Sequence, residues 1–141
     1  MDNISEERRS WNMSRIKGKD TKPELVVRRL LHSMGYRFRL HRKDLPGKPD
    51  IVLPKYRMVI FVHGCFWHRH NLCRYAYNPK SRTEFWNAKF KATIERDREN
   101  ATRLQTAGWR VIVVWECELK KNAQAVIHKI YQLLKGEDDG P

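Results

Sequence analysis

The stretch 62–73, VHGCFWHRHNLC, carries a dense set of side chains that could bind a metal. Thiolates and imidazoles hold structural zinc ions tetrahedrally. The candidate ligands are all three cysteines of the chain and one central histidine: Cys65, Cys73, Cys117 and His70. His63 and His68 are alternative histidine ligands. The other interpretation is three unrelated free cysteines, but their crowding with histidines favours zinc.

Two carboxylates could hold a hard cation beside a phosphodiester. Asp50 follows the turn 45–49, LPGKP, and opens a short apolar strand, while Glu24 lies early in an expected helix. Mg²⁺ prefers oxygen ligands and can polarise a phosphoryl oxygen. The alternatives are structural: Glu24 also fits a capping box with Thr21, and Asp50 could simply end the turn.

Histidine side chains near the cysteines could move protons. An imidazole titrates near neutral pH, so His63 or His68 could take a proton from water or give one to a leaving oxygen. Asp97 belongs to the series 90, 94, 97, 101, 104, which should face the sheet, and a carboxylate there needs a partner. We expect Asp97 to orient a catalytic histidine; a salt bridge to Arg or Lys is the alternative.

Large apolar side chains interrupt this polar, basic region. Phe66, Trp67 and Trp86 could insert between base pairs or stack on exposed bases. The alternative is a small satellite core around the zinc loop. Met13 and Ile16 in the N-terminal arm could form a second wedge, although docking onto the body explains them equally well.

The surrounding pattern predicts elements in the order αβββαβα, a sheet with helices on both faces. Thr21 and Pro23 begin the first helix and Gly35 ends it. The predicted later elements are strands 36–40, 50–53 and 58–62, a loop 63–83, a helix 84–106, a buried strand 109–115 and a helix from Asn122. Cys117 could meet the loop if the strand 109–115 borders the strand 58–62. Residues 1–20 form a basic arm, 21–135 one domain, and 136–141 a disordered tail.

The composition favours a globular domain that binds a polyanion. Of 141 residues, 40% are hydrophobic, and 29 Lys and Arg against 16 Asp and Glu give a formal net charge of +13. Nucleic acid is the commonest partner for such a chain, although a basic surface can also be merely solvated. We see no membrane-spanning stretch and no signal peptide, so we expect a cytoplasmic protein with thiols or metal ligands rather than disulfides.

Several motifs together resemble the very short patch repair (Vsr) endonucleases, over about residues 9–119. The markers are NM (12–13), DT (20–21), LPGKPD (45–50), VIFVHGCFWH (59–68), RTEFW (82–86), ERDR (95–98), GWRV (108–111) and WEC (115–117). One departure is that NL (71–72) adds a residue before Cys73, and Arg69 stands in place of a histidine. The resemblance implies a restriction-endonuclease-like α/β fold of the PD-(D/E)XK type, with a central mixed sheet.

The resemblance also implies roles for individual residues. Mg²⁺ would be held by Asp50 and the Val62 carbonyl, and Glu24 would hold a water of that ion. His68 would be the acid/base group, with His63 beside the scissile phosphate. The remaining assignments are zinc on Cys65, His70, Cys73 and Cys117; a wedge of Phe66, Trp67 and Trp86; an opposite wedge of Met13 and Ile16; and Lys89 on the mismatched bases.

We therefore expect a Mg²⁺-dependent, zinc-stabilised DNA endonuclease. It would nick one strand on the 5′ side of the mispaired thymine in T·G mismatches, which arise from deaminated 5-methylcytosine. We expect a monomer that acts on double-stranded DNA with repair-protein partners and no membrane contact. The rival functions are a restriction-type nuclease of the same fold, a non-catalytic zinc module that binds nucleic acid, and an RNA-binding factor.

Overall fold

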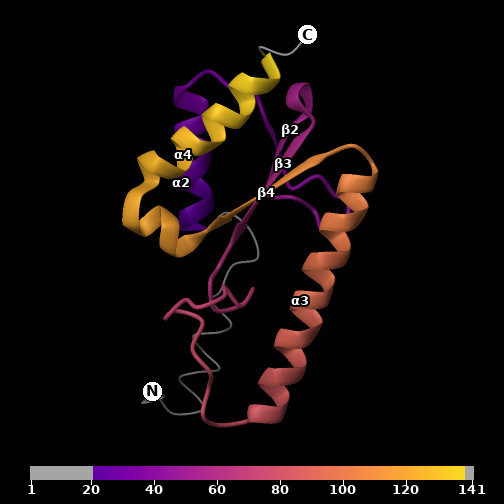
Figure 1. Cartoon of the computed structure of the whole chain (residues 1–141), viewed down its shortest axis with the longest axis vertical. Helices are drawn as coiled ribbons and strands as arrows, with labels where there is room; N and C mark the ends of the chain where they lie inside the picture. The colour runs from indigo at the N-terminus through magenta and orange to yellow at the C-terminus, as the bar shows by residue number, and fades with distance from the viewer. Residues whose placement is uncertain (1–20, 139–141) are drawn as a thin grey trace.

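The computed structural model describes residues 21–138, which form a four-stranded sheet between helices (Figure 1). The helices are α2 (Lys22–Ser33), α3 (Thr83–Thr106) and α4 (Glu116–Asp138), and a 3₁₀ turn, η1, spans Pro54–Tyr56. The strands are β1 (Arg39–Leu40), β2 (Ile51–Leu53), β3 (Met58–His63) and β4 (Arg110–Trp115). The predicted order αβββαβα is confirmed for the described part.

The sheet is mixed, with the strand order β1-β2-β3-β4. β1 and β2, and β2 and β3, pair antiparallel, while β3 and β4 pair parallel with His63 opposite Trp115. A parallel pair needs a long crossover, which α3 supplies. The prediction that the strands before and after α3 are neighbours is confirmed, because β3 pairs with β4. This pairing brings Cys117 to the same end of the sheet as His63.

Helices cover both faces of the sheet, as predicted. α2 and α4 pack over one face and α3 over the other (Figure 1). The larger core includes Val27, Leu31, Ile51, Leu53, Met58, Ile60, Ile127, Ile130 and Leu134. The smaller core, beneath α3, contains Val52, Val59, Leu104 and Trp109. Strand side chains alternate between the faces, so β2 and β3 contribute to both cores.

Helix α2 begins as its sequence predicts. Thr21 is the N-cap, and its Oγ1 accepts a hydrogen bond from the Glu24 N–H at 3.4 Å. Pro23 lies in the first turn, where its missing N–H costs nothing. This cap fixes the start of the helix and places Glu24 at the end that meets the sheet edge.

Three predicted elements differ from the structure. The strand expected over 36–40 is only Arg39–Leu40, because Tyr36 and Phe38 pack on the larger core without pairing to β2. β4 is half-exposed rather than buried, since it is an edge strand of the described sheet. The last helix has an additional helical segment before it, because α4 begins at Glu116 and is broken at Asn122, where φ is −162° and ψ is 89°. The predicted cap at Asn122 is confirmed, since its Oδ1 accepts a hydrogen bond of 3.0 Å from the Ala125 N–H.

The ends of the chain add two observations. α4 continues to Asp138, into the stretch 136–141 expected to be disordered. The predicted arm 1–20, with Met13 and Ile16, lies outside the described residues, as do residues 139–141. Within residues 21–138, no helix is long and apolar enough to cross a bilayer.

Candidate active site

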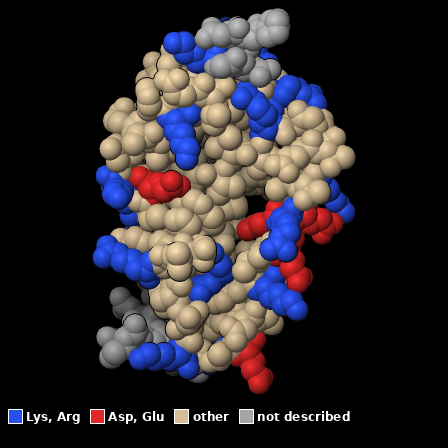
Figure 2. Space-filling view, in the orientation of Figure 1, with Lys and Arg blue, Asp and Glu red and all other residues tan. Residues whose placement is uncertain are grey.

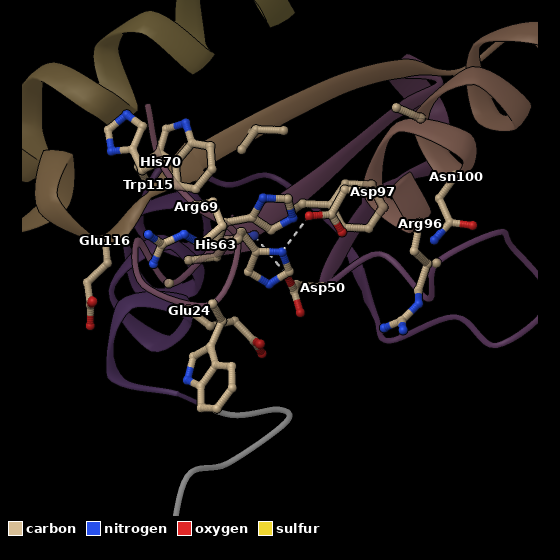
Figure 3. A pocket seen from close by; sticks show the side chains of 18 of the residues that line it. Glu24, Asp50, His63, Arg69, His70, Arg96, Asp97, Asn100, Trp115 and Glu116 are labelled. Atoms are coloured by element: carbon tan, nitrogen blue, oxygen red, sulfur yellow. Dashed lines mark hydrogen bonds and ion pairs between the residues drawn. The ribbon is translucent and has the colours of Figure 1, made fainter. Parts of the chain in front are cut away.

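A cavity of about 1730 Å³ opens between the sheet and α3. Figure 3 shows Glu24, Asp50, His63 and Asp97 converging on it from α2, the start of β2, the end of β3 and α3. Its Lys and Arg lining residues are Lys43, Lys48, Arg69, Arg96 and Arg98. Figure 2 shows Lys and Arg side chains spread over the face seen in Figure 1, with acidic side chains at fewer places and gathered mainly at the right of the view. The cavity can therefore receive an anionic chain at a site with buried carboxylates and imidazoles.

Asp50 lies directly before β2, at the edge where that strand begins beside β3. Its Oδ2 accepts a hydrogen bond of 2.7 Å from the Val62 N–H. Burial raises the pKa of Asp50 above its ordinary value, although this backbone hydrogen bond and the nearby His41, His68 and Arg28 oppose the rise. Burial thus makes the carboxylate charge costly, and a cation in the cavity would offset that cost.

Glu24 is almost completely buried, with 1% of its surface exposed. Its Oε2 forms an ion pair with Arg28, one turn later on α2, and lies 2.9 Å from His41 Nε2. The ligand atoms of Glu24, His41 and Asp50 all lie within 4.8 Å of one another. The carboxylate is therefore directed into the cavity with two basic partners, and its role extends beyond the helix cap.

His63, His68 and Asp97 form a second group in the same cavity. His68 Nδ1 and Asp97 Oδ2 are 2.6 Å apart, and the two imidazole rings stack with centroids 3.7 Å apart. Their ligand atoms lie within 4.8 Å of one another. Asp97 thus pairs with a histidine rather than with Arg or Lys, and it leaves His68 Nε2 for other partners.

Strand alternation explains this grouping. Val59, Phe61 and His63 are on the β3 face that looks toward α3, and Asp97 comes from α3. His63 is 8% exposed, and its burial, with the nearby His68, lowers its pKa to about 4. His63 is therefore neutral near neutral pH and can exchange hydrogen bonds without carrying charge.

The three cysteines gather with one histidine beyond the end of β4. The Sγ atoms of Cys65, Cys73 and Cys117 and one ring nitrogen of His70 lie within 4.8 Å of one another. His70 Nδ1 is 3.3 Å from Cys117 Sγ, and its ring stacks on Trp115 with centroids 4.2 Å apart. All three cysteines are free, but their gathering around one point does not fit the interpretation as unrelated thiols.

This four-residue set fits a tetrahedral zinc site. Three thiols and an imidazole are a common structural zinc ligand set. Burial raises the pKa of Cys65 to about 12, so its thiolate form needs a nearby cation. Of the three histidines weighed from the sequence, His70 joins the cysteines, whereas His63 and His68 belong to the group with Asp97.

An aromatic cluster lies beside these groups. Phe66 contacts Trp67, Trp86 and Phe90 edge-on, at centroid distances of 5.3, 5.5 and 5.2 Å. Trp86 is only 5% exposed, while Phe66 and Trp67 are half-buried. Trp86 is therefore part of a satellite core in this conformation. Its predicted contact with DNA stays a prediction that requires the cluster to open.

Arg69 fixes the loop that carries both the aromatic and the cysteine groups. Its guanidinium donates hydrogen bonds to the carbonyls of Phe66, Ala76 and Tyr77 at 3.0–3.3 Å. It also lies 3.9 Å from the ring centroid of Phe90. Arg69, which departs from the family pattern, thus stabilises the loop, because its planar guanidinium can donate hydrogen bonds to several carbonyls at once.

Sequence reasoning missed two partners of Glu24 and misjudged one residue of the cavity. His41 and Arg28 were not singled out, although the spacing of Arg28 from Glu24 on a helix could have indicated that ion pair. Ile94 was expected to face the sheet, but it is 38% exposed and lines the cavity. Lys89 is exposed on α3, with its Nζ 6.0 Å from the ring centroid of Trp67.

Comparison with known proteins identifies the family. The family model described as DNA mismatch endonuclease Vsr matches residues 1–74. The chain belongs to the Vsr family. The DNA mismatch endonuclease Vsr of Escherichia coli is 44% identical over 133 residues, which are 92% of this chain and 85% of that protein. The type II nicking enzyme V.XorIIP of Xanthomonas oryzae pv. oryzae is 57% identical over 118 residues, 84% of this chain and 86% of that protein.

A further relative agrees with this membership. The type II nicking enzyme V.NmeAIP of Neisseria meningitidis is 51% identical over 116 residues, 82% of each chain. The predicted membership is therefore confirmed, and the chain is an endonuclease of the Vsr family. Its small α/β structure with a mixed four-stranded sheet is consistent with that family.

Proposed function

We propose that this Vsr-family endonuclease nicks one strand of double-stranded DNA on the 5′ side of the mispaired thymine in a T·G mismatch. The observation that carries the proposal is the convergence of Glu24, Asp50, His63, His68 and Asp97 on one basic-lined cavity. We propose further that the fold is restriction-endonuclease-like, that the enzyme acts as a monomer, and that it repairs mismatches from deaminated 5-methylcytosine.

His68 is the general base or acid of the proposed reaction. Asp97 holds Nδ1, so Nε2 can take a proton from the attacking water or pass one to the leaving oxygen. Water attacks phosphorus, the bond to the 3′ oxygen breaks, and that oxygen gains a proton. The products carry a 3′-hydroxyl and a 5′-phosphate. The neutral His63 beside His68 hydrogen-bonds the scissile phosphate.

The acidic edge of the cavity fits a divalent metal ion. Asp50 and the Val62 carbonyl would hold Mg²⁺ near Glu24. A strand residue directs its N–H and C=O to the same edge, so the Val62 carbonyl belongs to the edge that meets Asp50. When bound, Mg²⁺ polarises the phosphoryl oxygen and stabilises charge on the leaving oxygen. Zinc on Cys65, His70, Cys73 and Cys117 would pin the loop to the end of β4.

Preference for a mismatch would come from the aromatic cluster. Inserting a ring between base pairs costs unstacking energy, about a few kcal/mol, and least at a weakly paired step. Phe66 and Trp67 form the more accessible part of the cluster, and Trp86 would follow if the cluster opens. Lys89, close to Trp67, would read the mismatched bases, and Met13 and Ile16 would approach from the opposite groove.

Nicking assays on matched and T·G duplexes test the proposal, with Mg²⁺ either supplied or chelated. We expect wild-type protein to nick the T·G duplex only with Mg²⁺, and Asp50→Ala to lose nicking. Asp44→Ala is the matched control, because Asp44 lies on the same loop but is exposed and pairs with Arg42. Equal cutting of matched duplex would favour a restriction-type nuclease. Unchanged nicking by Asp50→Ala would contradict the proposed site.

A further inference from the structure

The strongest unassigned feature of the cavity is His41, a histidine outside the family motifs. Its backbone N–H donates to the Asp50 carbonyl at 3.2 Å, which extends the antiparallel pairing of β1 and β2 by one residue. This register holds His41 directly across from the carboxylate proposed to bind metal. The side chain is mostly buried, with 21% of its surface exposed.

The backbone of His41 has an uncommon conformation. Its φ of +47° lies in the left-handed region, which is sterically unfavourable for a residue with a Cβ atom. Such conformations occur more often where a local geometry serves a function. At His41, the left-handed turn ends β1 and brings the imidazole beside Glu24 and Asp50.

The imidazole nitrogen lies where a metal ligand would lie. His41 Nε2 is buried and 2.9 Å from Glu24 Oε2, yet it has no hydrogen-bond partner. Neighbouring ligands in an octahedral site with bonds of about 2.1 Å are about 3 Å apart. Ligand atoms of Glu24, His41 and Asp50 all lie within 4.8 Å of one another. A cation between these three residues would therefore lie beside the His41 imidazole, whose buried Nε2 otherwise has no hydrogen bond.

We infer that His41 is a direct ligand of the catalytic divalent metal, beside Asp50. This inference rests on the proposed metal-dependent function and adds a ligand to it. Arg28 already neutralises part of the acidic charge at Glu24. An imidazole raises the affinity for a divalent metal through its nitrogen donor without adding charge to the site.

Binding of Mn²⁺ alone tests this assignment without any measurement of activity. Electron paramagnetic resonance titration gives the Mn²⁺ affinity, and its pulsed form detects a coupled ligand nitrogen. We expect a nitrogen coupling in the wild type that changes to the ¹⁵N pattern when the protein carries ¹⁵N-histidine. His41→Ala and the larger His41→Gln should lose this coupling and bind Mn²⁺ at least about tenfold more weakly.

Two controls locate the ion and the nitrogen. His32→Ala, an exposed histidine on α2, should keep both the affinity and the coupling. Asp50→Ala should lose the Mn²⁺ site, which excludes the cysteine cluster as its source. The inference is overturned if wild-type protein binds no Mn²⁺, if bound Mn²⁺ has no nitrogen coupling, or if the coupling persists in both folded His41 variants. The proposed function fails separately, if Asp50→Ala still nicks the T·G duplex.

Discussion

Replacing Asp97 by Asn should slow nicking through its effect on His68. The bond between His68 Nδ1 and Asp97 Oδ2 is 2.6 Å long, and both side chains are 29% exposed. A hydrogen bond to a charged group contributes about 1.5–3 kcal/mol. At about 1.4 kcal/mol for each factor of ten, the nicking rate should fall by about 10- to 150-fold. The partial exposure of the pair favours the lower part of this range.

Single-turnover nicking of a T·G duplex, with enzyme in excess, isolates this effect from product release. His68→Ala should lose about 100- to 10,000-fold, the usual contribution of a general acid or base. Because Asp97 is argued to act only through His68, the double variant should be no slower than His68→Ala. Glu99→Gln, which removes an exposed charge from the same helix, is the matched control. If the double variant shows the product of the two single losses, Asp97 acts independently and the reasoning is wrong.

Three further perturbations address stability and metal content. Cys117→Ser should reduce bound zinc from about one ion per chain to near zero, by atomic absorption, since it removes a ligand; full retention would contradict the site. Gly47→Ala should lower the free energy of unfolding in urea by about 1–3 kcal/mol, because φ is +74° and a Cβ would lie 2.9 Å from Asn100 Nδ2; equal stability would contradict this packing. The unfolded His63 titrates near 6.5 and the folded one near 4, so the unfolded state binds more protons between these values and stability should fall as pH is lowered through them. At about pH 5, His63 should have lowered the free energy of unfolding by about 2 kcal/mol. Measured by urea unfolding, the stability of the His63→Gln variant should therefore fall less steeply between about pH 7 and pH 5 than that of the wild type.

Local chemistry in the sequence was enough to predict most elements and the identity of many candidate groups. Thr21 and Pro23 start α2 because capping depends on neighbours within one turn. Asp97 was singled out as a carboxylate on an otherwise apolar helix stripe, and the structure gives it His68 as a partner. The motifs also predicted the Vsr family, which the comparisons confirm.

Tertiary structure decided which side chains meet. The parallel pairing of β3 with β4 brings Cys117 to His70, and the register of β1 against β2 brings His41 to Asp50. The tertiary structure also buries Trp86 in a satellite core, although the sequence equally allowed Trp86 to be an exposed wedge. Composition and spacing describe contacts within a few residues, whereas these contacts depend on strand register and on how α3 packs across the sheet. The chain thus specifies its chemical groups locally, and the fold selects which of them share one site.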